Sequence, residues 1–429
     1  MRLHIVSFRT KDWLGKGLST VRPSRGTYML NLKNTLALAV AASTLVVAVP
    51  AIAQDTGATI GFIGGFTGPI ESLTPPIFAG AELVVKQVNE QGGILGGELT
   101  MISADSACDA TGGATAADKI INTDNAVAVV GGLCTGETIG AFNGSGLSGN
   151  VVFVSPASSA PALTTLEDND LVYRTTPSDA LQGIKMADLL IAKGVKDIAI
   201  TYVNNDYGKG FADALSAAYT AAGGTVAANI AHEEGKADYR AELGNLTASQ
   251  NLVILAYANA SGNTVLRQAV ESGNFTLYVG GDGMVGDDLL SGIDAAAVEG
   301  LIATRAGAPE GAATTTYIDL ATAAGIEANA TYAPQAYDAA FLLALAIEKN
   351  GSASRDGLSA ALRDVSSAPG EKILPGEWTK AAELIKAGTD IDYDGAGGTL
   401  DFDAAGDVDG IIVELAVEGG KFVEKGLIK

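Results

Sequence analysis

Histidine, the side chain that most often does acid–base catalysis, is scarce in this sequence. His232 is the single histidine after residue 53, so a Ser-His-Asp arrangement would depend wholly on it. The stretch His-Glu-Glu at 232–234 also lacks the second histidine of a zinc-protease helix. We therefore expect His232 to lie at the surface, and we expect no catalytic residues, no enzyme activity and no catalytic metal.

A calcium-like spacing of carboxylates occurs near the C-terminus. Acidic residues at 390, 392 and 394, with Asp401 at position twelve, reproduce the ligand positions of an EF-hand loop. Asp401 replaces the usual bidentate Glu, however, and residues 399–402 are predicted to form a strand where an exiting helix would be needed. A Gly/Asp turn is therefore the favoured interpretation, and calcium binding stays an alternative.

Glycines at 61–65 resemble a phosphate loop in composition only. The stretch reads Gly-Phe-Ile-Gly-Gly and lacks the Gly-Lys-Ser/Thr ending of such a loop. We interpret it as the end of a strand, and we expect no cofactor.

Neutral hydrogen-bond donors follow two predicted strands. Thr135 comes after the strand predicted at 126–131, where its hydroxyl and nearby backbone N–H groups suit an anion such as a carboxylate. An Ala-Ser-Ser stretch at 157–159 follows the strand predicted at 151–154. The alternatives are a helix N-cap for Thr135 and an ordinary polar turn at 157–159.

Asp282 stands in Gly-Gly-Asp-Gly, directly after the strand predicted at 275–280. These four residues make a plain turn by their composition.

The elements that must position these residues alternate between short apolar runs and longer stretches of helical periodicity. This alternation is typical of βαβ units with a buried parallel sheet. Strands are predicted at 59–64, 98–104, 126–131, 151–154, 197–203, 225–230, 252–256, 275–280, 399–402, 410–417 and 421–423. Helices are predicted at 77–91, 114–121, 180–192, 208–222, 238–246 and 263–272, with a helix-rich part at 317–350 and 355–365.

Length predicts two lobes. The 376 residues from 54 to 429 exceed the roughly 250 to 300 residues at which a single core stops growing. We expect an α/β protein with two doubly wound parallel-sheet lobes joined by a multi-strand hinge. The first lobe is predicted to hold 54–174 and 306–390, and the second 175–305 and 391–429.

An export signal is predicted at the N-terminus. Residues 36–49 carry no charge, follow Lys33 and precede a small-x-small cleavage site before Gln54. Residues 1–53 are thus interpreted as leader and signal peptide, and we expect translation to start at Met29, which gives the signal an ordinary length. The mature protein would be soluble, in the periplasm.

Charge and cysteine content agree with an exported, soluble chain. Seven of the 27 basic and one of the 49 acidic residues lie in the first 53, which leaves 20 against 48 and a net charge near −28. Nucleic acid is therefore a poor partner. Cys108 and Cys134 both lie in the exported part, and in an oxidising compartment they most simply form one disulfide.

Specific motifs along 58–429 resemble the type I periplasmic binding proteins of the leucine/isoleucine/valine-binding kind. The order and spacing of these motifs carry the resemblance. They are Gly68-Pro69, Gly80-Ala81-Glu82, Val-Asn-Glu-Gln-Gly-Gly-Ile at 88–94, Asp-Ser-Ala-Cys-Asp at 105–109, Gly-Leu-Cys-Thr at 132–135, Val-Ser-Pro-Ala-Ser-Ser at 154–159, Asp-Tyr-Gly-Lys-Gly at 206–210, Tyr-Asp-Ala at 337–339 and Asp-Phe-Asp-Ala-Ala-Gly-Asp at 401–407.

The resemblance implies ligand-binding roles for polar residues. Thr135 corresponds to one carboxylate-binding position of the family, and Ala157, Ser158 and Ser159 correspond to a second carboxylate-binding segment. Asp282 takes the place of the acid that binds the ligand ammonium.

Aromatic residues are implied at the site as well. Tyr207 would close over the ligand from the second lobe, although a helix-start aromatic packed on the sheet is the alternative, and Tyr257 would supply a second ring. Leu73 stands where relatives of this kind place an aromatic, which leaves the side-chain specificity open.

The function implied is capture of a small molecule, without covalent chemistry. We expect a monomeric substrate-binding subunit that delivers a branched-chain or related amino acid to the membrane permease of an ABC importer. Two alternatives stay open on the same scaffold: a binder of an amide, aromatic or other small organic acid, and a sensory ligand-binding module.

Overall fold

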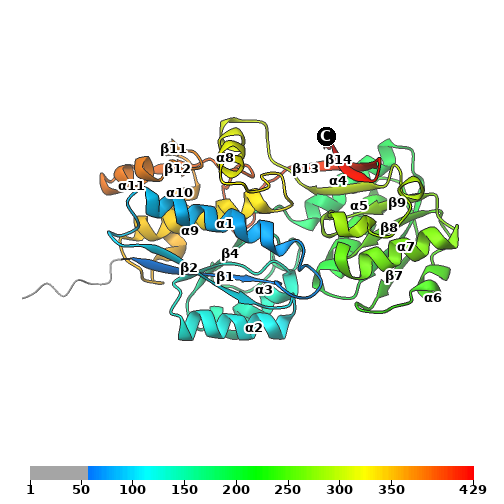
Figure 1. Ribbon diagram of the computed structural model, residues 1–429, viewed down its shortest axis with the longest axis horizontal. Coiled ribbons are helices and arrows are strands. Elements are labelled where there is room, and N and C mark those ends of the chain that lie inside the picture. The colour runs from blue at the N-terminus through cyan, green and yellow to red at the C-terminus, as the bar shows by residue number, and fades with distance from the viewer. Residues whose placement is uncertain (1–56) are drawn as a thin grey trace, which may run out of the picture. The chain divides into compact units, whose positions relative to one another are not determined.

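The computed structural model describes residues 57–429, and the predicted signal peptide and the start at Met29 lie outside these residues. A parallel sheet and a mostly parallel sheet dominate the described chain, one for each lobe (Figure 1). None of the helices in 57–429 is long and apolar enough to cross a membrane.

The first sheet has five parallel strands in the order β2-β1-β3-β4-β5. They are β1 (Ala58–Gly64), β2 (Leu99–Asp105), β3 (Ala128–Gly131), β4 (Val152–Ser155) and β5 (Val172–Arg174). Every residue of β3 and β4 is buried, because helices cover both faces of the sheet. This burial explains why these strands are continuous apolar runs in the sequence.

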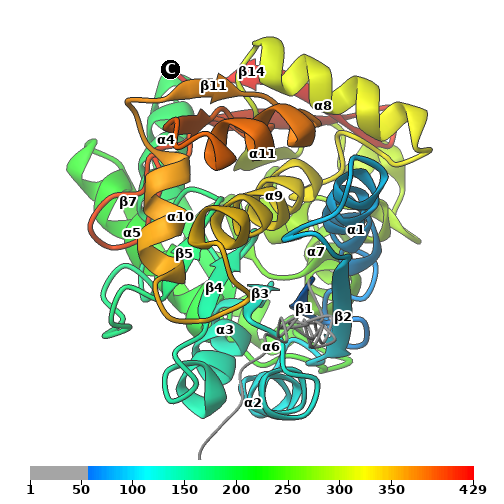
Figure 2. The same cartoon turned by 90° about the vertical axis from the view of Figure 1, so that its left-hand side faces the viewer.

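Helices α1 (Thr74–Glu90) and α9 (Ala333–Asn350) lie on one face of the first sheet, and α2 (Ala110–Asp118) and α3 (Thr135–Ala141) lie on the other (Figures 1 and 2). Nearly every residue of α9 from Ala333 to Ile347 is buried, as expected for a helix that is apolar all round. This helix fixes the position of Tyr332, which directly precedes it.

The second sheet has seven strands in the order β14-β13-β10-β9-β8-β6-β7. They are β6 (Asp197–Val203), β7 (Thr225–His232), β8 (Asn251–Leu255), β9 (Leu277–Gly280), β10 (Ile302–Ala306), β13 (Ile412–Glu418) and β14 (Lys421–Leu427). The strands from β6 to β10 are parallel, whereas β13 and β14 add an antiparallel edge. The helices of this lobe are α4 (Asp179–Ala192), α5 (Asp206–Ala221), α6 (Arg240–Gly244) and α7 (Asn263–Ser272).

The remaining α-helices and β-strands lie in the part of the chain from β10 to β13. They are α8 (Ala312–Ala323), α10 (Leu358–Ser366), α11 (Trp378–Lys386), β11 (Glu371–Ile373) and β12 (Ile391–Tyr393). The first passage of the chain between the sheets follows β5, the second follows β10, and the third runs from β12 to β13. These three connections form the predicted multi-strand hinge.

The segment after residue 390 differs from the sequence expectation. Strand β12, which was not predicted, pairs in parallel with β11 and packs against α10 and α11. Residues 399–402 are not a strand: apart from a single bridge between Asp394 and Thr399, they have no ladder. In the turn before these residues, the Asp338 carboxylate accepts the backbone N–H groups of Ala396 and Gly397, both at 2.7 Å.

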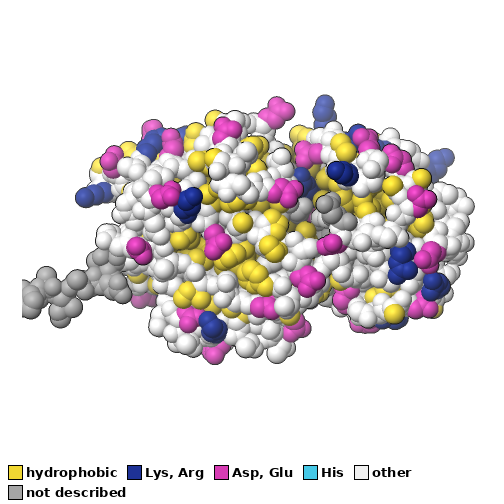
Figure 3. All heavy atoms as spheres, viewed as in Figure 1, with side chains coloured by type: hydrophobic (Ala, Val, Ile, Leu, Met, Phe, Trp, Pro, Cys, Tyr) yellow, Lys and Arg dark blue, Asp and Glu magenta, His cyan; other side chains and the backbone are white. Residues whose placement is uncertain are grey.

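The exposed surface is acidic without a single acidic patch on the face shown in Figure 3. Aspartate and glutamate side chains are scattered over this face, among fewer lysines and arginines. Such a distribution keeps a strongly negative protein well solvated.

Candidate functional site

A cavity lies where the carboxyl ends of the strands of both sheets meet. Its volume is about 30 Å³, which is room for only a few water-sized molecules. It is lined by Ile70, Leu73, Ile77, Leu133, Cys134, Thr135, Ala157, Tyr207, Tyr257, Asp282, Gly283 and Tyr332. The cavity is therefore smaller than an amino acid.

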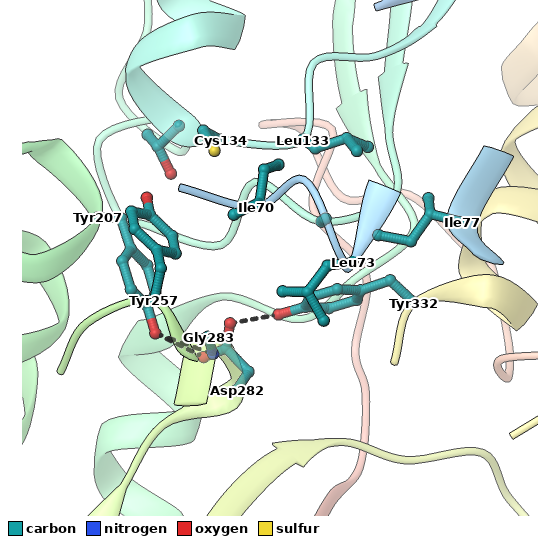
Figure 4. A pocket seen from close by; sticks show the side chains of 12 residues that line it. Ile70, Leu73, Ile77, Leu133, Cys134, Tyr207, Tyr257, Asp282, Gly283 and Tyr332 are labelled. Atoms are coloured by element: carbon teal, nitrogen blue, oxygen red, sulfur yellow. Dashed lines mark hydrogen bonds between the residues drawn. The ribbon is translucent and has the colours of Figure 1, made fainter. Parts of the chain in front are cut away.

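Asp282 is the charged group of the cavity lining. It follows β9, is 3% exposed, and accepts hydrogen bonds from the Tyr332 hydroxyl at 2.6 Å and the Tyr207 hydroxyl at 3.2 Å (Figure 4). Burial raises the pKa of Asp282, and burial together with this acid raises the pKa of both tyrosine hydroxyls well above 10. The tyrosines therefore act as donors, and a cationic group beside Asp282 would relieve the cost of its burial.

The backbone next to Asp282 packs closely against the Phe211 ring, which holds the acid in place. A Cβ on Gly281 would come within 2.6 Å of the Phe211 ring and 3.1 Å of the Tyr207 hydroxyl, so the residue before the acid must be glycine. The backbone N–H of Gly283 in turn donates to the Tyr207 hydroxyl at 3.2 Å. The glycines of the Gly-Gly-Asp-Gly stretch thus position Asp282 and also allow the turn.

Tyr207 and Tyr257 form one wall of the cavity. Their rings are stacked, with centroids 5.3 Å apart and an interplanar angle of 23°. Tyr207 lies in the first turn of α5, which Asn205 caps by accepting the backbone N–H of Gly208 at 2.9 Å. Asn205 also donates to the Tyr257 hydroxyl at 3.4 Å, so the cap of the helix connects to the wall of the site.

Thr135 lies across the cavity at the first residue of α3. Cys134, not Thr135, is the N-cap residue, and its backbone N–H donates to Glu137 Oε2 at 3.1 Å. The N-cap alternative for Thr135 is therefore wrong. The Thr135 hydroxyl instead accepts the backbone N–H of Ala160 at 3.3 Å, which connects the two predicted carboxylate-binding segments.

The side chains of Ser158 and Ser159 are not among the cavity-lining groups, unlike those of the other predicted site residues. The Ser158 hydroxyl donates to the carbonyl oxygen of Gly132 at 3.1 Å and bonds to the Thr138 hydroxyl at 2.7 Å. The Ser159 hydroxyl donates to Asp179 Oδ2 at 3.0 Å. Any contact of these two serines with a ligand in the cavity would have to come from their backbone.

Apolar side chains complete the cavity, and sequence reasoning found only one of them, Leu73. Ile70 and Leu73 come from the segment before α1, Ile77 from the first turn of α1, and Leu133 from the segment after β3. Figure 4 shows Ile77 and Leu133 on the side of the cavity away from Tyr257. The aliphatic side chains Leu73 and Ile77 thus lie away from the stacked pair Tyr207 and Tyr257, beside the ring of Tyr332.

Tyr332 is the functional candidate that sequence reasoning missed. It follows no strand, and its backbone has a left-handed conformation with φ of +67° before the buried helix α9. The Tyr-Ala-Pro sequence at 332–334, with proline in the first helical turn, marks a helix start but gives no sign of a binding role.

Comparison with known proteins adds to this geometry. The family described as periplasmic binding protein matches residues 57–391. The chain belongs to this family. The leucine-, isoleucine-, valine-, threonine- and alanine-binding protein of Pseudomonas aeruginosa is 30% identical over 319 residues, which cover 73% of this chain and 83% of that protein. The Leu/Ile/Val-binding protein BraC3 of Rhizobium johnstonii is 32% identical over 317 residues, 72% of this chain and 84% of that protein.

Solved structures share the two-lobed periplasmic binding protein fold. The leucine-binding protein LivK from Thermotoga maritima has a TM-score of 0.72 at 23% identity and covers 87% of this chain and 99% of its own. A solute-binding protein of R. palustris in complex with benzoate has a TM-score of 0.69 at 18% identity, and covers 87% of this chain and 96% of its own. The α/β architecture with two lobes is therefore that of the periplasmic binding proteins.

The predicted disulfide of this family member is present. Cys108 and Cys134 are bonded, with their Cα atoms 5.4 Å apart, and they connect the turn after β2 to the start of α3. Glu137 lies beside them, and burial raises its pKa to about 7. Within residues 57–429, these three are the group that could hold a metal ion, and the disulfide occupies both sulfur atoms. The bond holds the segment that carries Thr135.

The expectation that His232 lies at the surface is wrong. Its side chain is buried at the end of β7, with Nδ1 2.8 Å from the Thr201 hydroxyl and Nε2 3.1 Å from the Ser261 hydroxyl. Burial lowers its pKa to about 4, so the ring is neutral near pH 7. Thr201 lies within β6 and Ser261 in the helical turn after β8, and periodicity in the sequence does not show that these residues meet His232.

The calcium-like segment forms a turn, as the sequence favours. Gly395 and Gly398 are hydrogen-bonded through their backbones, and Asp392 pairs with Lys372 at 3.0 Å. Asp390 pairs with Lys349 at 3.3 Å. The carboxylates at positions one and three thus point to lysines and do not converge on one another.

Proposed function

We propose that this protein is the substrate-binding subunit of an ABC importer and that it binds a branched-chain or related amino acid between its two lobes. The observation that carries the proposal is the buried carboxylate of Asp282, held by two tyrosine hydroxyls in a cavity that is also lined by aliphatic side chains. Relatives named for leucine, isoleucine and valine binding support the same ligand class.

The polar groups of the cavity would divide the ligand's charges between them. Asp282 would accept hydrogen bonds from the ammonium, and the hydrogen bonds from the two tyrosines would favour its charged form against the effect of burial. Thr135 and the backbone at 157–159 would hold the ligand's carboxylate with neutral donors. Charged groups buried in this way need partners of opposite charge or several hydrogen bonds, which an amino acid supplies at both ends.

The aliphatic groups would bind the ligand's side chain. Ile70, Leu73, Ile77 and Leu133 offer no hydrogen bond, and burying a leucine-sized side chain against such groups contributes about 1.5 to 3 kcal/mol. A polar or charged ligand side chain would lose its hydration there without a partner. The cavity therefore favours small aliphatic amino acids.

Binding would act by changing the balance between open and closed arrangements of the lobes. Thr135 and Ala157 belong to the first lobe, and Tyr207, Tyr257 and Asp282 to the second, so a ligand that contacts both favours closure. We propose that residues 57–174 move together with the helices after residue 306, and that the closed form docks on the permease. No covalent step is needed, and the protein would act as a monomer, exported to the periplasm and cleaved before Gln54.

An aromatic or other organic acid is the second candidate ligand. The stacked pair Tyr207 and Tyr257 favours it, because a flat ring could pack against such a wall, and a protein of similar fold was solved with benzoate. This ligand would have no group to pair with Asp282. The two candidate ligands therefore differ in whether their binding needs Asp282.

Thermal unfolding of the exported chain with single amino acids and with benzoate tests the proposal. A ligand that binds only the folded state raises the stability by about 2.7 kcal/mol at a hundredfold excess over Kd. We expect leucine, isoleucine or valine to raise the unfolding temperature. If no amino acid does so while benzoate does, the organic-acid alternative replaces the amino acid.

A further inference from the structure

Arg174 is a buried cation that lies beside the cavity without lining it. It is the last residue of β5, and 1% of its side chain is exposed. Its Nη1 donates to the carbonyl oxygens of Ser158, Ser159 and Ala160 at 3.4, 2.8 and 3.0 Å. A single guanidinium thus holds the backbone of the segment that follows β4.

The same guanidinium reaches the third passage between the lobes. Its Nε and Nη2 donate to the two carboxylate oxygens of Asp407 at 2.7 and 2.8 Å, a bidentate pair. Thr164 completes the arrangement, since its hydroxyl donates to Asp407 Oδ2 at 2.7 Å and accepts from Arg174 Nη2 at 2.9 Å. The charge of Arg174 is therefore neutralised from a segment more than two hundred residues away in the chain.

The backbones of the two passages are also in contact. The N–H of Arg174 donates to the carbonyl oxygen of Gly406 at 3.0 Å. Gly406 has φ of +74°, and a Cβ there would come within 2.3 Å of the carbonyl oxygen of Val172. Arg174 thus lies where the chain leaves the first lobe after β5. It also contacts the connection from β12 to β13, by which the chain leaves that lobe a second time.

Peptide geometry links this arrangement to the cavity. In a trans peptide the N–H points away from the preceding carbonyl oxygen. Because the carbonyls of Ser158 and Ser159 face the guanidinium, the N–H groups of Ser159 and Ala160 point away from it. The N–H of Ala160 meets the hydroxyl of Thr135, a cavity-lining residue, at 3.3 Å. The cation behind the carbonyls also polarises these peptides, which strengthens their N–H groups as donors.

We propose that Arg174 is a positioning residue for the ligand's carboxylate: it orients the peptide N–H groups at 159–160 that act with Thr135, and through Asp407 it ties them to the chain that passes between the lobes. The inference rests on the proposed function, because it places a carboxylate at Thr135. Arg174 itself does not touch the ligand. Within residues 57–429 none of the Arg174 side-chain hydrogen bonds goes to Asp282 or to the aliphatic residues, so we expect its main effect at the carboxylate end.

Two variants and one control separate this role from a structural one. Arg174→Lys removes the guanidinium that bonds to three carbonyl groups and to Asp407. Thr164→Val removes the hydroxyl that bonds to both Arg174 and Asp407, and it keeps the charges of these two residues. Arg355→Lys is the matched control, because Arg355 also donates to three carbonyl groups, those of Ile121, Ala126 and Gly149, away from the cavity. The probes are L-leucine and L-leucinamide, which differ in the carboxylate alone, and titration calorimetry gives both affinities.

We expect the wild-type protein to prefer leucine, and Arg174→Lys and Thr164→Val to weaken leucine binding about tenfold or more while leucinamide binding changes little. Arg355→Lys should keep the wild-type preference. An unchanged preference in folded Arg174→Lys and Thr164→Val, or an equal loss for both probes, overturns the role of Arg174 and leaves the proposed function intact. If the wild type binds benzoate instead of leucine, benzoate and benzamide make the same comparison, and a wild type that binds neither pair overturns the proposed function and this inference together.

Discussion

The hydroxyl of Tyr332 donates a 2.6 Å hydrogen bond to Oδ2 of Asp282, and this bond connects the segment before α9 to the end of β9. The two residues are 50 positions apart in the chain, and both are buried in the cavity lining. Tyr332 therefore holds the carboxylate that we propose for the ligand ammonium, and it does so from the other side of the hinge.

Tyr332→Phe should weaken amino-acid binding. The substitution leaves the ring in place and removes one donor from Asp282, whose charged form then loses a hydrogen bond worth about 1.5 to 3 kcal/mol. We expect a loss of affinity of about tenfold, measured by titration calorimetry with leucine. Tyr317→Phe is the control, because the buried Tyr317 hydroxyl makes no hydrogen bond within the described residues and its loss should leave the affinity unchanged. Equal affinities for both variants would remove Tyr332 from the site.

Asp282→Asn tests the ammonium contact directly. The amide keeps the shape of the side chain but loses its charge, so an amino acid would leave its ammonium buried without a counter-charge. We expect an affinity for leucine lower by about a hundredfold, or roughly 3 kcal/mol. Benzoate, which has no ammonium, should bind Asp282→Asn at least as well as the wild type.

Asp338→Asn provides the comparison for Asp282→Asn. Asp338 is also fully buried and accepts three hydrogen bonds, from the Tyr393 hydroxyl at 2.8 Å and two backbone N–H groups, but it lies outside the cavity lining. Its substitution should lower the free energy of unfolding and leave leucine affinity as it is. Full affinity in Asp282→Asn would show that the ligand does not use this acid.

Much of the fold could be predicted because apolar runs in the sequence reflect burial on both sides of a parallel sheet. Strand β6 and helix α7 have the predicted bounds, and the other long elements differ by a few residues at their ends. Four strands were not predicted, because they have only three to five residues and include polar or charged ones; they are β5, β10, β11 and β12. Residues 399–402 were predicted as a strand, but Thr399 makes a single bridge to Asp394 and the three residues after it join no sheet.

Part of the cavity lining could be predicted, from strand ends together with the family resemblance. Thr135, Ala157 and Asp282 each follow a strand of a parallel sheet, and such positions converge at one edge. Tyr332 lies before a helix, so its place depends on how α9 packs on α1 and the first sheet. Ser158 and Ser159 follow the right strand, but local sequence does not tell which way their hydroxyls turn.

Loss of the Cys108–Cys134 disulfide should destabilise the protein. The bond closes a loop with a sequence separation of 26, which corresponds to about 3 to 4 kcal/mol in the chain-entropy model. Urea unfolding of the Cys108→Ser/Cys134→Ser double variant against the oxidised wild type measures this difference. Because Cys134 precedes Thr135 and lines the cavity, we also expect weaker leucine binding in the variant. An unfolding midpoint equal to that of the wild type would contradict the stabilising role.

His232 should make the folded state sensitive to acid. Burial lowers its pKa from 6.5 to about 4, so the unfolded chain takes up a proton before the folded one does. The stability that neutral His232 provides is full above pH 6.5 and is lost as the pH falls from there toward 4, by about 3 kcal/mol in all. His232→Gln keeps a polar group between Thr201 and Ser261 but cannot take up a proton, so its stability should fall less over this range.

The difference between wild type and His232→Gln is the quantity to measure, because other buried groups titrate nearby. Glu137 and Asp338 have pKa values raised by burial to about 7, so each favours the folded state more as the pH falls below 7. These acids act against the effect of His232 in both proteins alike, and they cancel in the difference. Urea unfolding at several pH values between 4 and 7.5 should show the wild type losing stability relative to the variant as the pH falls. Parallel profiles would mean that His232 has the same pKa in the folded and the unfolded chain.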